Sequence, residues 1–134
     1  MSAEGSKKRH VYVAGPLTKP DPFANVHQAV KVAEELRLAG FVPFVPHLNV
    51  LWAMVDPSPT YQNWIDWCLA WIERCDFLVR IPGESSGSDI EWEYAGSLGK
   101  PRYLLKRVVH AGNEVFAWWL FNVQPQEHLS QEGG

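Results

Sequence analysis

The chain has 134 residues, 46% of them hydrophobic and 20% charged, which suits one folded domain with its own core and excludes a disordered or fibrous chain. The net charge of -3 and the absence of a Lys/Arg stripe argue against long nucleic acid as a partner. No apolar run approaches the ~20 residues of a membrane span, and residues 1–10 lack a signal peptide's apolar core, so we expect a cytoplasmic protein without a membrane partner.

Strand and helix patterns alternate through the first half of the chain. Residues 9–15 (RHVYVAG) predict a first strand, and residues 22–39, between Asp21 and Gly40, predict an amphipathic helix. Residues 41–45 predict a second strand, in which Pro43 indicates an edge position. Residues 46–59 show no periodicity and predict a long loop.

The second half continues the alternation. Thr60 is a suitable N-cap for a helix that ends near Arg74, and residues 76–81 predict the third strand. After a loop at 82–87 we expect a helix over 88–98, closed by Gly99. A fourth strand over 102–106 and a very apolar helix over 113–121 complete the predicted elements.

This order predicts a single α/β domain with a mainly parallel sheet of four to five strands and helices on both faces, a flavodoxin-like or Rossmann-like three-layer sandwich. We expect the domain to span residues 9–123, between a flexible N-terminus at 1–8 and a polar tail at 124–134. Ligands in such sheets bind beyond the carboxyl ends of the strands. The loops after the first and third strands should therefore converge on one cleft.

The sequence predicts neither a cofactor nor a metal. It contains no GxxxxGK[ST] or GxGxxG pattern, no CxxC, and no His at ligand spacing. Cys68 and Cys75 lie about 10 Å apart along one predicted helix, beyond disulfide reach, so we expect both to be reduced.

The most informative segment is PGESSGSDIEWEYA, which begins at Pro82. Its glycines and serines, Ser85, Gly87 and Ser88 among them, form a donor-rich turn before a helix N-terminus, suited to an anion or to sugar hydroxyls. Local sequence offers a structural alternative, because Ser88 and Glu91 form the SxxE pattern of a capping box. Asp89 could likewise only complement the helix dipole.

Four motifs in order resemble the nucleoside 2-deoxyribosyltransferase superfamily: VYVAGPLT near the start, VPH after the second strand, CD at the third, and PGESSGSDIEWEYAGSLGKP. More narrowly, the chain is similar to a bacterial and phage branch marked by an RLPGxSxGADxE-like stretch. The resemblance covers roughly residues 11–106. It implies cleavage or transfer at the N-glycosidic bond of a nucleoside or its 5′-monophosphate, through a covalent glycosyl intermediate.

The resemblance also implies roles for individual residues. Glu91 matches the family's nucleophile, and Tyr12 matches a tyrosine that orients it, although Tyr12 could also be a packed strand aromatic. Gly15 and Pro16 would form the floor of the sugar pocket, or simply a tight turn. Ser85 stands where related monophosphate hydrolases bind phosphate, which favours a nucleotide, although a serine in a solvated turn fits equally well.

One position departs from the family pattern. The acid that the family places eight residues before Asp76 is Cys68 in this chain, and the nearest carboxylate, Asp66, is rotated by about 200° on a helix. Either a register shift brings Asp66 into the site, or another group such as His47 or Asp56 activates the leaving group, or the activity is lost.

The predicted function is therefore that of a deoxyribosyltransferase or nucleotide N-glycosidase, and the alternative is an inactive nucleotide- or sugar-phosphate-binding module of the same fold. The apolar segment VFAWWLF, residues 115–121, predicts either core packing or a homo-oligomer interface.

Overall fold

The sheet has five strands in the order β2-β1-β3-β4-β5. The computed structural model describes residues 7–123, with side chains up to residue 106 and at 111–112. β1 to β4 run parallel, and β5 pairs antiparallel with β4. The strands are β1 His10–Ala14, β2 Val42–Phe44, β3 Phe77–Arg80, β4 Arg102–His110 and β5 Asn113–Val123.

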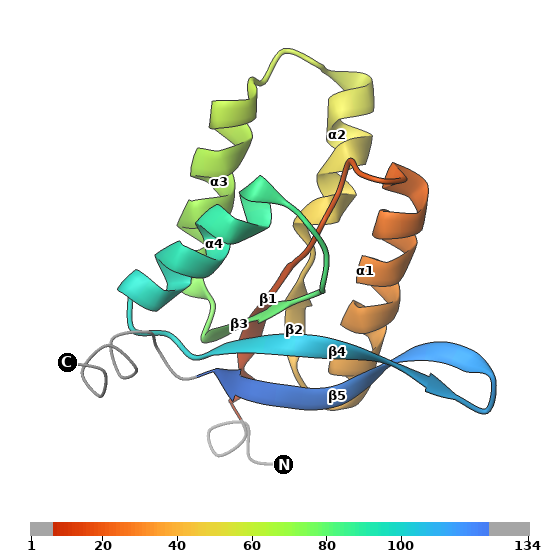
Figure 1. Cartoon of the computed structure of the whole chain (residues 1–134). Helices are drawn as coiled ribbons and strands as arrows, with labels where there is room; N and C mark the ends of the chain where they lie inside the picture. Colours follow the sequence, from red (N-terminus) through yellow and green to blue (C-terminus); the bar gives the residue numbers. More distant parts are fainter. Residues whose placement is uncertain (1–6, 124–134) are drawn as a thin grey trace.

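Helices cover both faces of this sheet, α1 on one side and α3 with α4 on the other, while α2 lies beyond the strand ends (Figure 1). Their bounds are α1 Pro22–Leu38, α2 Asn49–Val55, α3 Tyr61–Arg74 and α4 Ser86–Ser97, with a short 3₁₀ turn at Pro46–Leu48 before α2. The predicted three-layer α/β fold is confirmed. Pro43 lies in β2 at the edge of the sheet, as its missing N–H requires.

Local sequence explains where two helices start. The Asp21 side chain accepts from the backbone N–H of Phe23 and caps α1. Thr60 and Asn63 form a reciprocal capping box at the start of α3. Each cap satisfies backbone donors that have no partner inside the helix.

The hydrophobic core has two layers, one on each face of the sheet. The α1 side is built from buried aliphatic side chains and Phe77, and the α3/α4 side includes Tyr12, Ala14, Cys68, Ile72, Cys75, Leu78 and Ala95. Tyr12 therefore points from the middle of β1 toward α3 and α4.

Arg102 fixes the position of α4 against the sheet. Arg102 is 1% exposed, and its guanidinium lies 4.9 Å from the centroid of the Trp92 ring and donates to the Trp92 carbonyl. Gly96 leaves the space for it, because a Cβ there would lie 2.5 Å from Nη1 of Arg102. This contact seats the helix that carries Glu91.

Two predicted elements are wrong. Residues 46–59 hold the 3₁₀ turn and α2 rather than a continuous loop, because α2 spans only seven residues, too few to show helical periodicity. Residues 113–121 form a strand, not a helix. Ala111 and Gly112 both have positive φ (53° and 82°) and make the two-residue turn of a hairpin, and aromatic and branched residues favour the strand.

Some predictions fall outside the described residues. These are the polar tail at 124–134 and most of the N-terminal segment at 1–8. The packing of the VFAWWLF side chains is also not described. Among residues 7–123, no helix is long and apolar enough to cross a membrane.

Candidate active site

The candidate site lies where the chain reverses its direction across the sheet. From β1 the chain continues to β2 on one side, whereas β3 continues to β4 on the other, and ligands of such sheets bind at this switch point. The two loops that follow β1 and β3 are in contact there. A Cβ on Gly83, whose φ is +135°, would lie 2.6 Å from Cγ of Pro16, so only glycine allows this approach.

Glu91 projects from α4 toward the sheet beneath these loops. It shares the buried face of the helix with Ser88 and Ala95, and its exposed fraction is 7%. The hydroxyl of fully buried Tyr12 donates to Oε2 of Glu91 over 2.8 Å. The tertiary fold thus joins two residues that lie 79 positions apart in the sequence.

Burial dominates the electrostatics of this pair. Removal from water raises the pKa of Glu91 to about 7, although hydrogen bonds from Tyr12 and Cys68 and the charge of Arg80 act in the opposite direction. Burial and the neighbouring carboxylate also raise the pKa of Tyr12 well above its ordinary value. Tyr12 therefore remains a hydrogen-bond donor, and Glu91 changes its charge near neutral pH.

The capping box expected from Ser88 and Glu91 is not present. α4 begins at Ser86, two residues earlier than predicted, and Ser85 is its N-cap, with Oγ accepting from the N–H of Ser88 over 3.1 Å. The Ser88 side chain is 2% exposed, and its Oγ has no partner among the described residues. Glu91 consequently lies in the second turn, where the helix dipole contributes little to its ionisation.

Cys68, and not Asp66, faces Glu91 from α3. Cys68 is 7% exposed and interacts by hydrogen bonds with both Tyr12 and Glu91, and burial raises its pKa to about 12. Asp66 is exposed and accepts from the side-chain amide of Gln62 over 2.8 Å. Because no register shift occurs in α3, the structure does not bring Asp66 together with the other candidate residues.

His47 lies under the loop after β1. Its Nε2 is 3.1 Å from the carbonyl oxygens of both Gly15 and Pro16, and since carbonyls only accept, Nε2 carries the proton and donates to both. The side chain is 3% exposed, its Nδ1 has no partner among the described residues, and burial lowers its pKa. In this position His47 holds the loop in place.

Sequence reasoning missed Arg80, at the carboxyl end of β3. Its guanidinium pairs with Asp89 over 2.5 Å and donates to the carbonyl of Gly83 over 3.1 Å, and its side chain is 12% exposed against 67% for Asp89. Asp89 is therefore engaged by Arg80 at the start of α4. Its place in the sequence could have indicated a role, because Arg80 is the first residue of the family-like stretch RIPGESSGSDIE.

Gly87 lies in the first turn of α4 beside the start of α3. A Cβ at this position would lie 3.6 Å from the hydroxyl of Tyr61 and 4.0 Å from Oγ of Ser85. Three candidates for ligand binding, Ser85, Gly87 and Ser88, are thus brought together at one helix N-terminus, next to the contact between Pro16 and Gly83.

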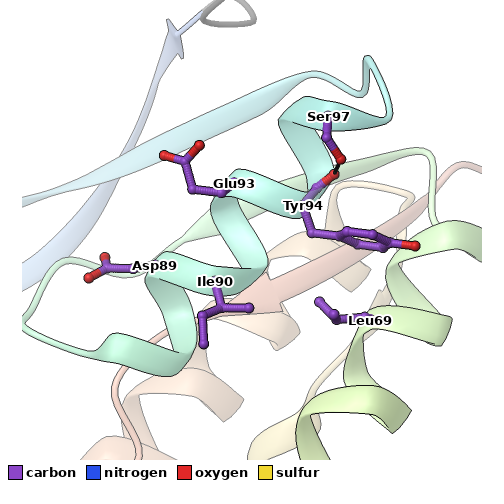
Figure 2. A pocket seen from close by; sticks show the side chains of 6 residues that line it. All are labelled: Leu69, Asp89, Ile90, Glu93, Tyr94 and Ser97. Carbon is purple, nitrogen blue, oxygen red and sulfur yellow. Dashed lines mark hydrogen bonds between the residues drawn. The ribbon is translucent and has the colours of Figure 1, made fainter.

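A surface pocket lies elsewhere, on the outer side of α4. Figure 2 shows its lining side chains, which come from α4 and, with Leu69, from α3. They are Leu69, Asp89, Ile90, Glu93, Tyr94 and Ser97. Glu91 and Tyr12 are not among them, because Glu91 faces the sheet from the other side of α4 and Tyr12 belongs to β1. The chemistry of the buried pair therefore does not belong to this pocket.

Comparisons with known proteins identify the family of the chain and the fold that it shares with solved structures. Residues 9–103 match the family model described as "Domain of unknown function (DUF4406)". A 2-deoxyribosyltransferase from Bacillus psychrosaccharolyticus is 26% identical, with a TM-score of 0.53 over 71% of this chain and 70% of that one. A second, from Leishmania mexicana, is 19% identical with the same TM-score over 84% and 81%, which shows a common fold. No curated protein sequence matches the chain.

Proposed function

The chain belongs to the DUF4406 family, within the nucleoside 2-deoxyribosyltransferase-like superfamily, and on this basis we propose that it cleaves or transfers across the N-glycosidic bond of a nucleoside or its 5′-monophosphate. The observation that carries the proposal is the buried hydrogen bond between Tyr12 and Glu91 at the switch point of the sheet. Glu91 is the proposed nucleophile and Tyr12 the residue that orients it.

The reaction proceeds in two displacements at the anomeric carbon. The ionised Glu91 attacks this carbon, the bond to the base nitrogen breaks, and its electron pair leaves with the base, which takes up a proton. Water or a second base then attacks the glycosyl ester, gives up a proton, and restores the carboxylate. The Tyr12 hydrogen bond fixes the carboxylate and supports its ionised form.

Protonation of the leaving base is the demanding step in this site. Cys68 stands beside Glu91, but a thiol whose pKa is about 12 is a poor general acid at neutral pH. Among the described residues Asp66 points to solvent, and His47 donates to two backbone carbonyls. Departure of the base therefore depends on solvent or on a substrate whose base leaves readily.

A 5′-monophosphate suits the surroundings of Glu91. The first turn of α4 offers backbone N–H groups beside the Ser85 hydroxyl, and the guanidinium of Arg80, which is paired with Asp89, lies near the same turn. The Ser88 hydroxyl has no partner among the described residues. These donors favour an anionic substrate group over a neutral 5′-hydroxyl.

The test is incubation with ribo- and deoxynucleosides and their 5′-monophosphates, with and without an acceptor base, followed by chromatography of the free base. Wild-type protein should release base, Glu91→Ala should not, and Glu93→Gln, on the exposed face of the same helix, should behave like wild type. Because Glu91 must be ionised, kcat/KM should fall tenfold per pH unit below about 7 and level off above it. Equal release by wild type and Glu91→Ala would refute the proposal.

The position of Cys68 favours a second candidate, a binding module without chemistry. In that case a nucleotide raises the melting temperature by mass action, but no base is released. Intact-protein mass spectrometry separates the two candidates. A glycosyl adduct that is absent from Glu91→Ala supports the enzyme, whereas a thermal shift without adduct or turnover supports the module.

A further inference from the structure

Two polar side chains form hydrogen bonds with the carboxylate of Glu91, and both hold their own protons at neutral pH. The Tyr12 hydroxyl donates to Oε2 of Glu91 over 2.8 Å, and burial raises its pKa well above the ordinary value. Cys68 is 7% exposed, and burial raises the pKa of its thiol to about 12. Neither group is therefore a general acid for a base that leaves the anomeric carbon.

The other candidate acids are engaged away from this carboxylate. His47 carries its proton on Nε2 and donates it to two carbonyls of the loop after β1, so its Nδ1 can only accept. Burial lowers the pKa of His47, which disfavours a second proton. Asp56 and Asp66 are exposed and accept hydrogen bonds from Ser58 and Gln62 of their own segments. Within residues 7–106, none of these candidates is placed to protonate a leaving base.

The charge of the site also favours a positively charged substrate. Arg80, whose positive charge acts on Glu91, is already paired with Asp89, so these two charges compensate each other. The ionised Glu91 then adds one negative charge in a buried position beside the neutral Tyr12 and Cys68. A buried charge is costly unless an opposite charge lies close to it. A cation in the substrate would supply that opposite charge.

We propose that the substrates are N-glycosides whose base is itself a cation, such as a quaternary pyridinium or an N7-alkylated purine. This class of base rests on the proposed function of Glu91. As Glu91 attacks the anomeric carbon, the bond to the base nitrogen breaks and its electron pair neutralises the cationic ring, so the base leaves without taking up a proton. Water then attacks the same carbon, the bond to Glu91 breaks, its electron pair restores the carboxylate, and one proton passes to solvent.

Nucleotides that differ in the charge of the base test the proposal. Release of base from 7-methylguanosine 5′-monophosphate is compared by chromatography with release from guanosine 5′-monophosphate, after subtraction of the rate without protein. The cationic member should have a kcat/KM at least ~100-fold higher, because a general acid contributes about 10²- to 10⁴-fold and only the neutral base needs one. Glu91→Ala should release neither base. Equal kcat/KM for the two members overturns the proposal and leaves the proposed function standing, whereas no release from any nucleotide removes both.

The pH profile with nicotinamide mononucleotide, a pyridinium nucleotide, gives an independent measurement. Because Glu91 must be ionised, kcat/KM should rise with pH to a plateau above about 7. It should show no fall at higher pH, since no acid has to stay protonated. A fall that is absent from the stability of the protein over the same range would reveal a required acid and overturn the proposal.

Cys68→Asp places a carboxylic acid beside Glu91 and completes the test. In this variant kcat/KM for guanosine 5′-monophosphate should rise at least ~10-fold, and the ratio between the cationic and the neutral nucleotide should narrow. Cys68→Asn is the matched control, because it has the shape of Asp without an acidic proton, and it should not narrow the ratio. Far-UV circular dichroism verifies that both variants are folded. A folded Cys68→Asp whose ratio equals that of Cys68→Asn overturns the proposal, and the wild-type comparison decides alone if the variant does not fold.

Discussion

Replacing Glu91 by Gln should stabilise the protein while it abolishes turnover. Burial raises the pKa of Glu91 from its ordinary 4.5 to about 7, so the folded protein binds a proton more tightly than the unfolded chain between these values. The contribution of Glu91 to stability is therefore complete below pH 4.5 and is lost as the pH rises through 7. A shift of this size corresponds to ~3 kcal/mol of lost stability above pH 8.

Gln has the shape of a protonated Glu and needs no desolvation of a charge. At pH 8 the variant should unfold about 10 °C above wild type, and at pH 4 the two melting temperatures should converge. Differential scanning calorimetry at both pH values measures this, and Glu93→Gln, whose side chain is exposed, should match wild type at each. A Glu91→Gln variant that is no more stable than wild type at pH 8 would show that the carboxylate is well solvated.

Three further predictions concern the surroundings of the site. Burial favours the neutral form of His47, so the folded protein loses stability as the pH falls below 6.5, the ordinary pKa of histidine. The stability difference between wild type and His47→Asn should therefore shrink from pH 7 to pH 5 in thermal unfolding. Gly83→Ala should cost at least ~2 kcal/mol in urea unfolding because of its clash with Pro16, whereas Gly99→Ala, with φ +74° and no neighbour within 4 Å, should cost ~1 kcal/mol. Asp66→Asn should change the free energy of unfolding by less than ~0.5 kcal/mol and leave any base release unchanged, because the Asp66 carboxylate lies in solvent. A loss of activity would contradict the orientation of α3.

The sequence predicts the fold well where apolar residues recur at helix or strand spacing over a whole element. The helices after Asp21 and Thr60 have both caps and periodicity, and the structure confirms them. The resemblance to 2-deoxyribosyltransferases is likewise confirmed by the shared fold. Residues 113–121 could not be assigned in this way, because a short run of apolar aromatics fits a helix or a strand equally. The turn at Ala111 and Gly112 decides between them.

The site was harder to predict than the fold, because it depends on the residue at which a helix starts and on which face of the helix packs against the sheet. A start two residues earlier converts Ser88 from an N-cap into a buried residue and removes the capping box. On α3, a difference of two positions decides that Cys68 faces inward and Asp66 outward. Such offsets lie within the usual uncertainty of predicted helix boundaries.

The hydrogen bond between Tyr12 and Glu91 also makes the perturbed pKa of this glutamate a property of the folded state. In the unfolded chain Glu91 is one solvated carboxylate among others, and Tyr12 is 79 positions away. The perturbed ionisation arises only when β1, α3 and α4 pack together. In a nascent or partly unfolded chain Glu91 therefore has the ordinary pKa of a solvated glutamate, so the chemistry proposed for it requires these three elements to be packed.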